Sequence, residues 1–230
     1  MKNRPDNHAT FPMKKILALN GSPRRNGNTS HMLYHFLTGA QRKTHEIEEV
    51  FVHELNLEFC RGCLRCNVLG RCSIHGDAWE NLSSKILESD ILVFATPVYF
   101  HHVTAQLKRV IDRFRSFIHV AITETGLEHT PRHTWRKDFV LLMSMGSSSD
   151  TDAQPAVELF EFMTSILGDR NHLHVVAATR LAVNNQVAKS REELLKLYPK
   201  LNLSAEMAES DYLRNQQILQ KCNDLGRDLT

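Results

Sequence analysis

The sequence predicts an α/β protein of three layers, in which helices cover both faces of a five-stranded parallel sheet. The first observation is that five short apolar segments, typical of buried strands, alternate with segments of helical spacing. The second is composition: 230 residues that are 42% hydrophobic and 23% charged can build a sizeable core and are not typical of a disordered chain. No internal repeat or low-complexity linker divides the sequence. We therefore expect residues 14–230 to form one domain, preceded by a flexible tail at residues 1–13.

The predicted strands are apolar runs bounded by polar or turn-forming residues. They span residues 15–20, 46–52, 90–96, 138–145 and 172–179. Helices are predicted where apolar side chains recur every three or four positions, as Leu107, Val110 and Ile111 do within residues 104–118. The remaining helices begin at Thr29 and span residues 77–88, 153–167, 190–197 and 204–225.

Charge and hydropathy disfavour two classes of partner. Lys and Arg number 28 and Asp and Glu number 26, a formal net charge of +2 that is too even to predict a nucleic-acid surface. No uncharged apolar run reaches the roughly 20 residues of a transmembrane helix, so no membrane contact is expected. The first residues are basic with no apolar stretch behind them, which predicts no secretory signal and a cytoplasmic location. Structural disulfides are rare in that compartment.

The loop after the first predicted strand, Gly21-Ser-Pro-Arg-Arg-Asn-Gly-Asn-Thr29, is suited to a phosphate group. Ligands of open α/β sheets bind beyond the carboxyl ends of the strands. Here a tight loop leads into a helix N-terminus, whose free amides and partial positive charge favour an anion. The loop lacks the lysine of a P-loop and the dinucleotide pattern GxGxxG, which disfavours nucleotide hydrolysis. From the residues alone, a plain strand-to-helix turn is equally consistent.

Residues 19–33, LNGSPRRNGNTSHML, resemble the phosphate loop of the flavodoxin-like NADPH-dependent FMN reductase family, whose pattern is roughly GSPRxxGNT. The resemblance implies a flavodoxin-like sandwich with strand order 2-1-3-4-5. It also implies that the phosphate of FMN is held by Ser22, Arg24, Asn28 and Thr29.

A second stretch, residues 89–113, resembles another signature of this family, in which a strand ends in TPVY and the next helix carries LKxxIDR. Pro97 ends the strand and fixes a turn. Backbone groups and flat side chains after it would contact the flavin, and a glycine after the fourth strand would let the backbone approach the ring. The residues placed beside the flavin in this way are Pro97, Val98, Tyr99, Phe100, Gly146 and Ser147. Asp112 and Arg113 are expected to form a structural ion pair or a subunit contact.

Four cysteines, Cys60, Cys63, Cys66 and Cys72, lie within 13 residues of a loop at 60–77. Spacings of two, two and five residues let successive thiolates reach the corners of one compact inorganic cluster. The segment resembles the cysteine motif of the iron–sulfur flavoproteins, which carry FMN and a [4Fe-4S] cluster. It also resembles the general CxGCxxCxxxGxC segment of the FMN reductase family, which does not require a cluster. Three alternatives stay open: a cluster, a zinc ion on four thiolates, or free thiols lining the flavin site or a subunit interface.

The resemblance implies an FMN-dependent oxidoreductase that passes electrons from NAD(P)H through the flavin to a quinone, a free flavin or another small acceptor. Hydride transfer to flavin requires no acid or base from the protein, so no catalytic side chain is predicted. A first alternative is an iron–sulfur electron carrier that exchanges electrons with a ferredoxin-like redox protein. A second is a non-catalytic flavin-binding module whose cysteines hold zinc. The family further implies a homodimer or a higher homo-oligomer.

Overall fold

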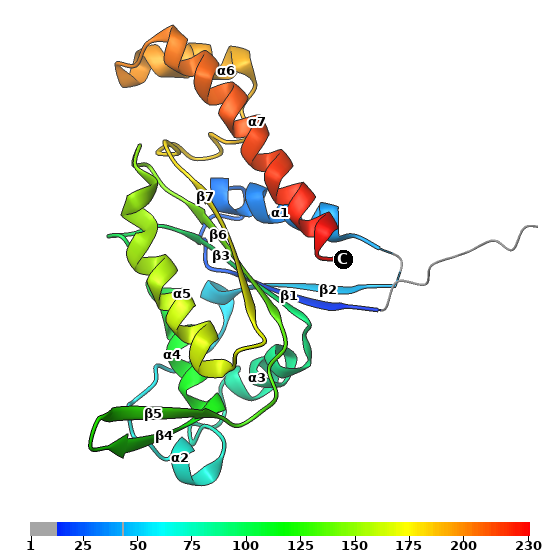
Figure 1. Ribbon diagram of the computed structural model, residues 1–230. Helices are drawn as coiled ribbons and strands as arrows, with labels where there is room; N and C mark the ends of the chain where they lie inside the picture. Colours follow the sequence, from blue (N-terminus) through cyan, green and yellow to red (C-terminus); the bar gives the residue numbers. More distant parts are fainter. Residues whose placement is uncertain (1–12, 43) are drawn as a thin grey trace, which may run out of the picture.

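The computed structural model describes residues 13–42 and 44–230. The predicted tail at residues 1–13 therefore lies outside the described residues, apart from Met13, which is exposed and belongs to no helix or strand. Figure 1 shows a twisted central sheet with helices on both sides of it. None of the described helices combines the length and apolarity that a membrane span requires.

The central sheet consists of five parallel strands. Their spatial order is β2 (Glu46–Phe51), β1 (Lys15–Asn20), β3 (Ile91–Pro97), β6 (Asp138–Ser144) and β7 (His172–Ala178). Numbered alone, these strands have the order 2-1-3-4-5, which confirms the predicted topology. The central strands β3 and β6 are buried along almost their whole length, because helices cover both of their faces. The edge strand β2 instead has no fully buried residue.

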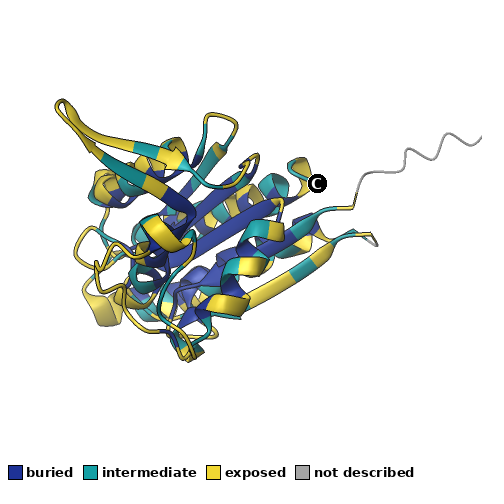
Figure 2. Cartoon of the chain, turned by 90° about the horizontal axis from the view of Figure 1, so that it is seen from below, coloured by how far each residue is buried: buried dark blue, intermediate teal, exposed yellow. Residues whose placement is uncertain are grey.

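Helices on the two faces of the sheet build two separate cores (Figure 1). On one face lie α1 (Asn28–Ala40) and α7 (Ala205–Asp228); on the other lie α3 (Trp79–Glu88), α4 (Ala105–Arg113) and α5 (Gln154–Leu167). Successive side chains of a strand point to opposite faces. Ile16 and Ala18 of β1 therefore join the core under α1 and α7, whereas Leu17 and Leu19 join the other. Figure 2 shows the buried sheet enclosed by helices whose outer faces are exposed.

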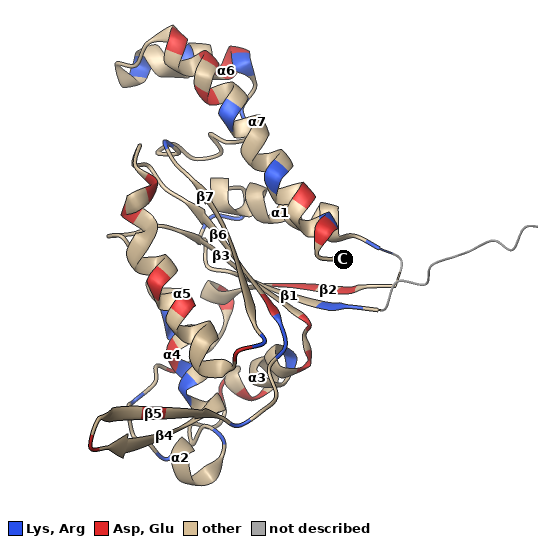
Figure 3. Cartoon of the chain, in the orientation of Figure 1, with Lys and Arg blue, Asp and Glu red and all other residues tan. Residues whose placement is uncertain are grey.

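Two glycines allow α1 and α7 to approach closely. A Cβ atom on Gly39 would lie 1.9 Å from the carbonyl oxygen of Asn223, and one on Gly226 would lie 2.1 Å from the carbonyl oxygen of Phe36. The first part of α7 continues beyond the sheet and packs with α6 (Arg191–Leu197) in a small core of its own. Both α6 and α7 carry residues of either charge along their length (Figure 3).

One predicted helix is wrong in length, and a hairpin follows it that the sequence analysis did not assign. Residues 104–118 were expected to be helical, but α4 ends at Arg113, and Phe114–Phe117 form a 3-10 turn. The rings of Phe114 and Phe117 pack against Trp79 and Trp135, which favours the tighter turn over a continued helix. An antiparallel hairpin follows, formed by β4 (Ile118–Thr123) and β5 (Gly126–Pro131). The other predicted strands and helices agree with the structure to within three residues, and a short α2 (Cys66–Leu69) lies in the cysteine loop.

Candidate functional site

A cavity of about 350 Å³ opens beyond the carboxyl ends of the sheet strands. Its walls come from the loops that follow β1, β3, β6 and β7, the usual position for a ligand in an open α/β sheet. Predicted cofactor residues that line it are Ser22, Arg24, Asn28, Thr29, Pro97, Val98, Tyr99 and Gly146. Phe100 and Ser147 do not line it. Sequence reasoning missed Leu181 and Ala182, although their position just after the last sheet strand could have indicated them.

The N-terminus of α1 opens into this cavity with free backbone donors. Gly27 is the N-cap, no side chain caps the helix, and its first turn contains no acidic residue. Within the described residues, the amide N–H groups of Asn28, Thr29 and Ser30 have no hydrogen-bond acceptor. Free amides at a helix N-terminus, reinforced by the helix dipole, favour an anionic group such as a phosphate.

Asn28 itself has a structural contact for each polar atom of its side chain. Its Nδ2 donates to the carbonyl oxygens of Leu181 (3.2 Å) and Val183 (2.9 Å), and its Oδ1 accepts from the amide of Val187 (2.9 Å). The side chain thus fixes the loop after β7 as a wall of the cavity. The backbone N–H of Asn28 is therefore free at the helix N-terminus, whereas its side-chain amide is already bonded elsewhere.

The other predicted phosphate ligands differ in what their side chains contact. Ser22 Oγ accepts from the amide of Arg24 (3.1 Å), which closes the turn, and the buried Thr29 Oγ1 lies 2.7 Å from Ser144 Oγ. The Arg24 guanidinium has no partner in the part of the chain that the structure describes, and it lines the cavity. Neighbouring Arg25 instead pairs with Glu54. Arg24 is therefore the one of these side chains that is free to meet an anion.

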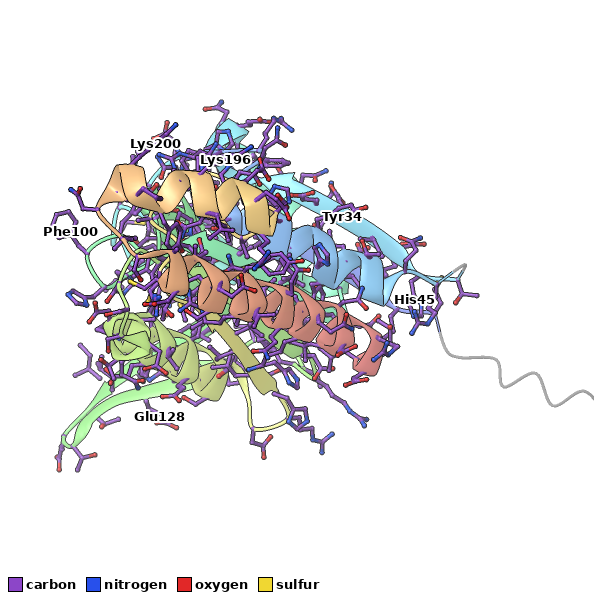
Figure 4. All side chains as sticks on the ribbon, turned by 90° about the horizontal axis from the view of Figure 1, so that it is seen from above. Tyr34, His45, Phe100, Glu128, Lys196 and Lys200 are labelled. Atoms are coloured by element: carbon purple, nitrogen blue, oxygen red, sulfur yellow. The ribbon has the colours of Figure 1, made fainter. Side chains whose placement is uncertain are left out.

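The segment after β3 turns sharply beside the cavity. The amide of Val98 donates to the carbonyl oxygen of Ser144 (2.8 Å), and Tyr99 pairs with His102 in an isolated bridge. Between them, Phe100 and His101 adopt left-handed backbone conformations with φ of +49° and +63°, which are strained for side chains of this size. As a result Tyr99 lines the cavity, whereas the fully exposed ring of Phe100 projects away from the body of the protein (Figure 4).

Two small residues, Gly146 and Ala182, line the cavity on the side of the loops after β6 and β7. A Cβ atom on Gly146 would lie 3.4 Å from the Cβ of Ala182, an ordinary van der Waals contact, so the loops after β6 and β7 lie side by side here without requiring a glycine. Ser147 supports the same contact, because its carbonyl oxygen accepts from the amide of Arg180 (2.7 Å). In the interior beside the loop after β1, the buried Thr104 Oγ1 donates to the carbonyl oxygen of Gly21 (2.9 Å) and caps α4.

The four clustered cysteines surround one small cavity about α2. Cys60 and Cys63 are exposed, Cys72 is half-buried and Cys66 is buried, and none of the four forms a disulfide with another described cysteine. Among the described residues, no three or more His, Cys, Asp or Glu side chains are placed to hold a single metal ion. Burial raises the pKa of the Cys66 thiol, an effect that the nearby Arg115 partly offsets. A hydrogen bond with Ser73 lowers the pKa of Cys63.

A buried ion pair closes the cysteine loop at its base. Arg113 of α4 binds Asp77, and the same carboxylate accepts from the backbone amides of Glu58 (2.9 Å) and Trp79 (3.1 Å). Both ends of the loop are thus held by one side chain. Burial alone would raise the pKa of Asp77, but these hydrogen bonds and the charge of Arg113 bring it below its usual value. Asp112 and Arg113 do not pair with each other, because Asp112 binds Lys108 on the surface and Arg113 binds Asp77; the alternative, a subunit contact, stays a prediction.

The fold and the cavity define a flavodoxin-like α/β protein whose strand-end loops surround a helix N-terminus with free backbone amides. Residues 14–187 match the family model of the NADPH-dependent FMN reductases, and the chain belongs to that family.

Curated relatives resemble part of the chain. An iron–sulfur flavoprotein of Archaeoglobus fulgidus is 36% identical over 105 residues, which cover 46% of this chain and 47% of the relative. An FMN-dependent NADH:quinone oxidoreductase of Thiobacillus denitrificans is 34% identical over 102 residues, or 44% of this chain and 48% of the relative. The chain thus spans about half the length of the curated relatives that it matches.

Solved structures share the fold at low sequence identity. An azoreductase from Bacillus anthracis has a TM-score of 0.61 at 16% identity, with 94% of this chain and 100% of that chain covered. An NAD(P)H:quinone oxidoreductase from Methanothermobacter marburgensis has a TM-score of 0.59 at 15% identity, with 95% and 96% covered. At such identities the likeness demonstrates the fold alone.

Proposed function

We propose that the protein binds FMN in the strand-end cavity and passes electrons from NAD(P)H to a quinone, a free flavin or another small acceptor. The observation that carries this proposal is the N-terminus of α1, where Asn28 and Thr29, whose backbone amides are free, line one cavity together with Arg24, whose guanidinium has no partner among the described residues. Membership of the FMN reductase family supports FMN as the anionic ligand. Bound FMN would accept a hydride from the nicotinamide and release electrons to the acceptor.

The chain's own residues would bind and orient the cofactor. The amides of residues 28–30 and the Arg24 guanidinium would hold the phosphate. Pro97, Val98 and Tyr99 would contact the ring from the loop after β3, and the loops after β6 and β7 would enclose it from the opposite side. Phe100 is not assigned to the ring, because its side chain projects into solvent.

The experiment is an anaerobic absorption spectrum of the purified full chain after addition of FMN, followed by NADH or NADPH and then a quinone. Flavin bands near about 375 and 450 nm that bleach with NAD(P)H and return with the quinone are expected from an oxidoreductase. A protein that does not take up FMN would refute the proposal. A protein that binds FMN but turns over no NAD(P)H would point to a non-catalytic flavin-binding module.

A second candidate function, an iron–sulfur electron carrier, is favoured by the surroundings of the cysteines. Four thiols around one cavity can supply the four thiolates of a [4Fe-4S] cluster, whereas zinc requires ligands that converge on one ion. Arg113 and Arg115 line the same cavity and would offset the negative charge of such a cluster. In this case the acceptor would be a ferredoxin-like redox protein.

Iron and zinc assays on the FMN-loaded sample separate the candidates. About four irons per chain, lost in Cys63→Ser while FMN stays bound, would support the electron carrier. One zinc per chain would support the alternative metal, and neither metal would leave the thiols free. We also propose that the protein forms a homodimer or a higher homo-oligomer, which sedimentation of the same sample tests.

A further inference from the structure

Arg115 lies against the only buried thiol of the cysteine loop as the structure describes it. Its Nη1 donates to Cys66 Sγ at 3.7 Å, and Cys66 Sγ in turn lies 3.8 Å from the carbonyl oxygen of Arg115. The same Nη1 also donates to the carbonyl oxygen of Ile118 at 3.0 Å. The guanidinium therefore touches the wall of the cysteine cavity from the side of the hairpin.

Other contacts hold this guanidinium in one place. Asn67 Oδ1 accepts from Arg115 Nη2 (2.8 Å) and from the amide of Val120 (3.1 Å), while Asn67 Nδ2 donates to the carbonyl oxygen of Val120 (2.7 Å). Arg132, at the end of the hairpin, donates to the carbonyl oxygens of Cys66 and Asn67. Arg115 and Arg132 thus hold α2 against the hairpin formed by β4 and β5.

The charge of this region is unbalanced. Residues 59–76 contain three arginines and no acidic residue. Arg113 has Asp77 as its counter-ion, but among the described residues no carboxylate pairs with Arg115 or Arg132, and both arginines are partly buried. A partly buried cation without a carboxylate partner is stabilised by another anion nearby. Thiolates at the cysteine cavity would be such an anion for Arg115 and Arg132, and a cluster held by four thiolates is negatively charged overall.

We propose that Arg115 is a positioning residue that sets the reduction potential of the four-cysteine centre through its charge and its hydrogen bond to Cys66. The inference rests on the second candidate function, the [4Fe-4S] cluster. Each added electron makes the centre one unit more negative, and a fixed cation beside it stabilises the reduced form more than the oxidised form. Removal of Arg115 should therefore lower the potential.

The test is an anaerobic redox titration of the full FMN-loaded chain, in which the cluster is followed by electron paramagnetic resonance. At the potential where half of the wild-type cluster is reduced, Arg115→Gln should show a roughly tenfold higher ratio of oxidised to reduced cluster, a shift of about 59 mV for one electron. Arg115→Lys, which keeps the charge, should recover most of the shift. Arg71→Gln is the matched control, since Arg71 lies in the same loop but is exposed and does not line the cysteine cavity.

A second variant, Asn67→Asp, is used if Arg115→Gln loses its iron. This substitution places a carboxylate beside the Arg115 guanidinium. It should lower the reduction potential although Arg115 is still present. An unchanged potential in the Arg115→Gln or Asn67→Asp variant that retains iron would overturn the proposal. An equal shift in Arg71→Gln would overturn it too. Absence of iron from the wild-type protein would overturn it as well, yet NAD(P)H bleaching of FMN in that sample would leave the proposed reductase function standing.

Discussion

Arg113 Nη1 donates to Asp77 Oδ2 at 2.7 Å, and the two side chains are only 0% and 3% exposed. The same guanidinium nitrogen donates to the carbonyl oxygen of Glu58 at 2.8 Å. One ion pair therefore joins α4 to both ends of the cysteine loop. The loop carries four left-handed positions, at Gly62, Leu64, Gly70 and Gly76, and needs such an anchor to keep its shape.

Asp77→Asn should destabilise the protein by about 3–5 kcal/mol, because it leaves the buried Arg113 without a counter-ion. The measurement is the free energy of unfolding from urea denaturation. Asp112→Asn is the matched control: its pair with Lys108 is exposed, so the loss should stay below about 0.5 kcal/mol. Similar losses in the two variants would contradict the structural role given to Asp77.

The contribution of Asp77 to stability should depend on pH. Its pKa in the folded protein lies below the ordinary value of 3.8, so the native state binds fewer protons than the unfolded state when the pH falls below that value. The stability difference between the wild type and Asp77→Asn should be constant above about pH 5 and should shrink as the pH falls through 3.8 and then through the folded pKa. Denaturation curves at several acidic pH values check this, and a difference that grows towards acid would contradict it.

Arg24→Ala should weaken FMN binding roughly tenfold, because a charge-assisted hydrogen bond to the phosphate is lost from a partly solvated site. Titration of flavin fluorescence gives the affinity. Arg25→Ala removes the same charge one residue later, but Arg25 pairs with Glu54 and lies over the ring of Phe51, so its loss should leave the affinity unchanged. Equal effects would indicate a general charge effect rather than the cavity described.

Gly39→Ala should destabilise the protein by about 1–3 kcal/mol. The added methyl group would meet the backbone of Asn223, and a backbone cannot rotate away as a side chain can, so α1 and α7 must separate. Thr38→Ala on the exposed face of α1 should change the stability by less than about 0.5 kcal/mol. Thermal unfolding of both variants tests the pair, and an unaffected Gly39→Ala would show that the helices pack less closely.

The sheet was predictable from the sequence because its central strands are almost wholly apolar and short. The hairpin at residues 118–131 was not, since its alternation is weak and its side chains are largely half-buried or exposed. The helical spacing of residues 104–118 continued into Phe114, which hid the end of α4. The aromatic packing that ends this helix involves Trp79 and Trp135, both distant in sequence.

Sequence motifs located the cavity but did not assign every role within it. The position of Arg24 followed from the loop pattern, and the structure leaves its guanidinium free. The side chain of Asn28 was expected to meet a phosphate, yet it binds backbone groups of residues 181–187, which lie over 150 residues away in sequence. A sequence motif therefore predicts which residues lie in a loop. It does not predict the hydrogen-bond partner of each side chain, because that partner can come from a segment distant in sequence.

Helix α4 links the two sites mechanically. It starts at the cap Thr104, which holds Gly21 of the loop after β1, and ends at Arg113, which holds the base of the cysteine loop. Nine helical residues rise about 14 Å, so this helix sets the spacing between the strand-end cavity and the cysteine loop. Insertions elsewhere in either loop would leave this distance unchanged, whereas a one-residue deletion within α4 would shorten it and rotate one anchor by about 100° relative to the other.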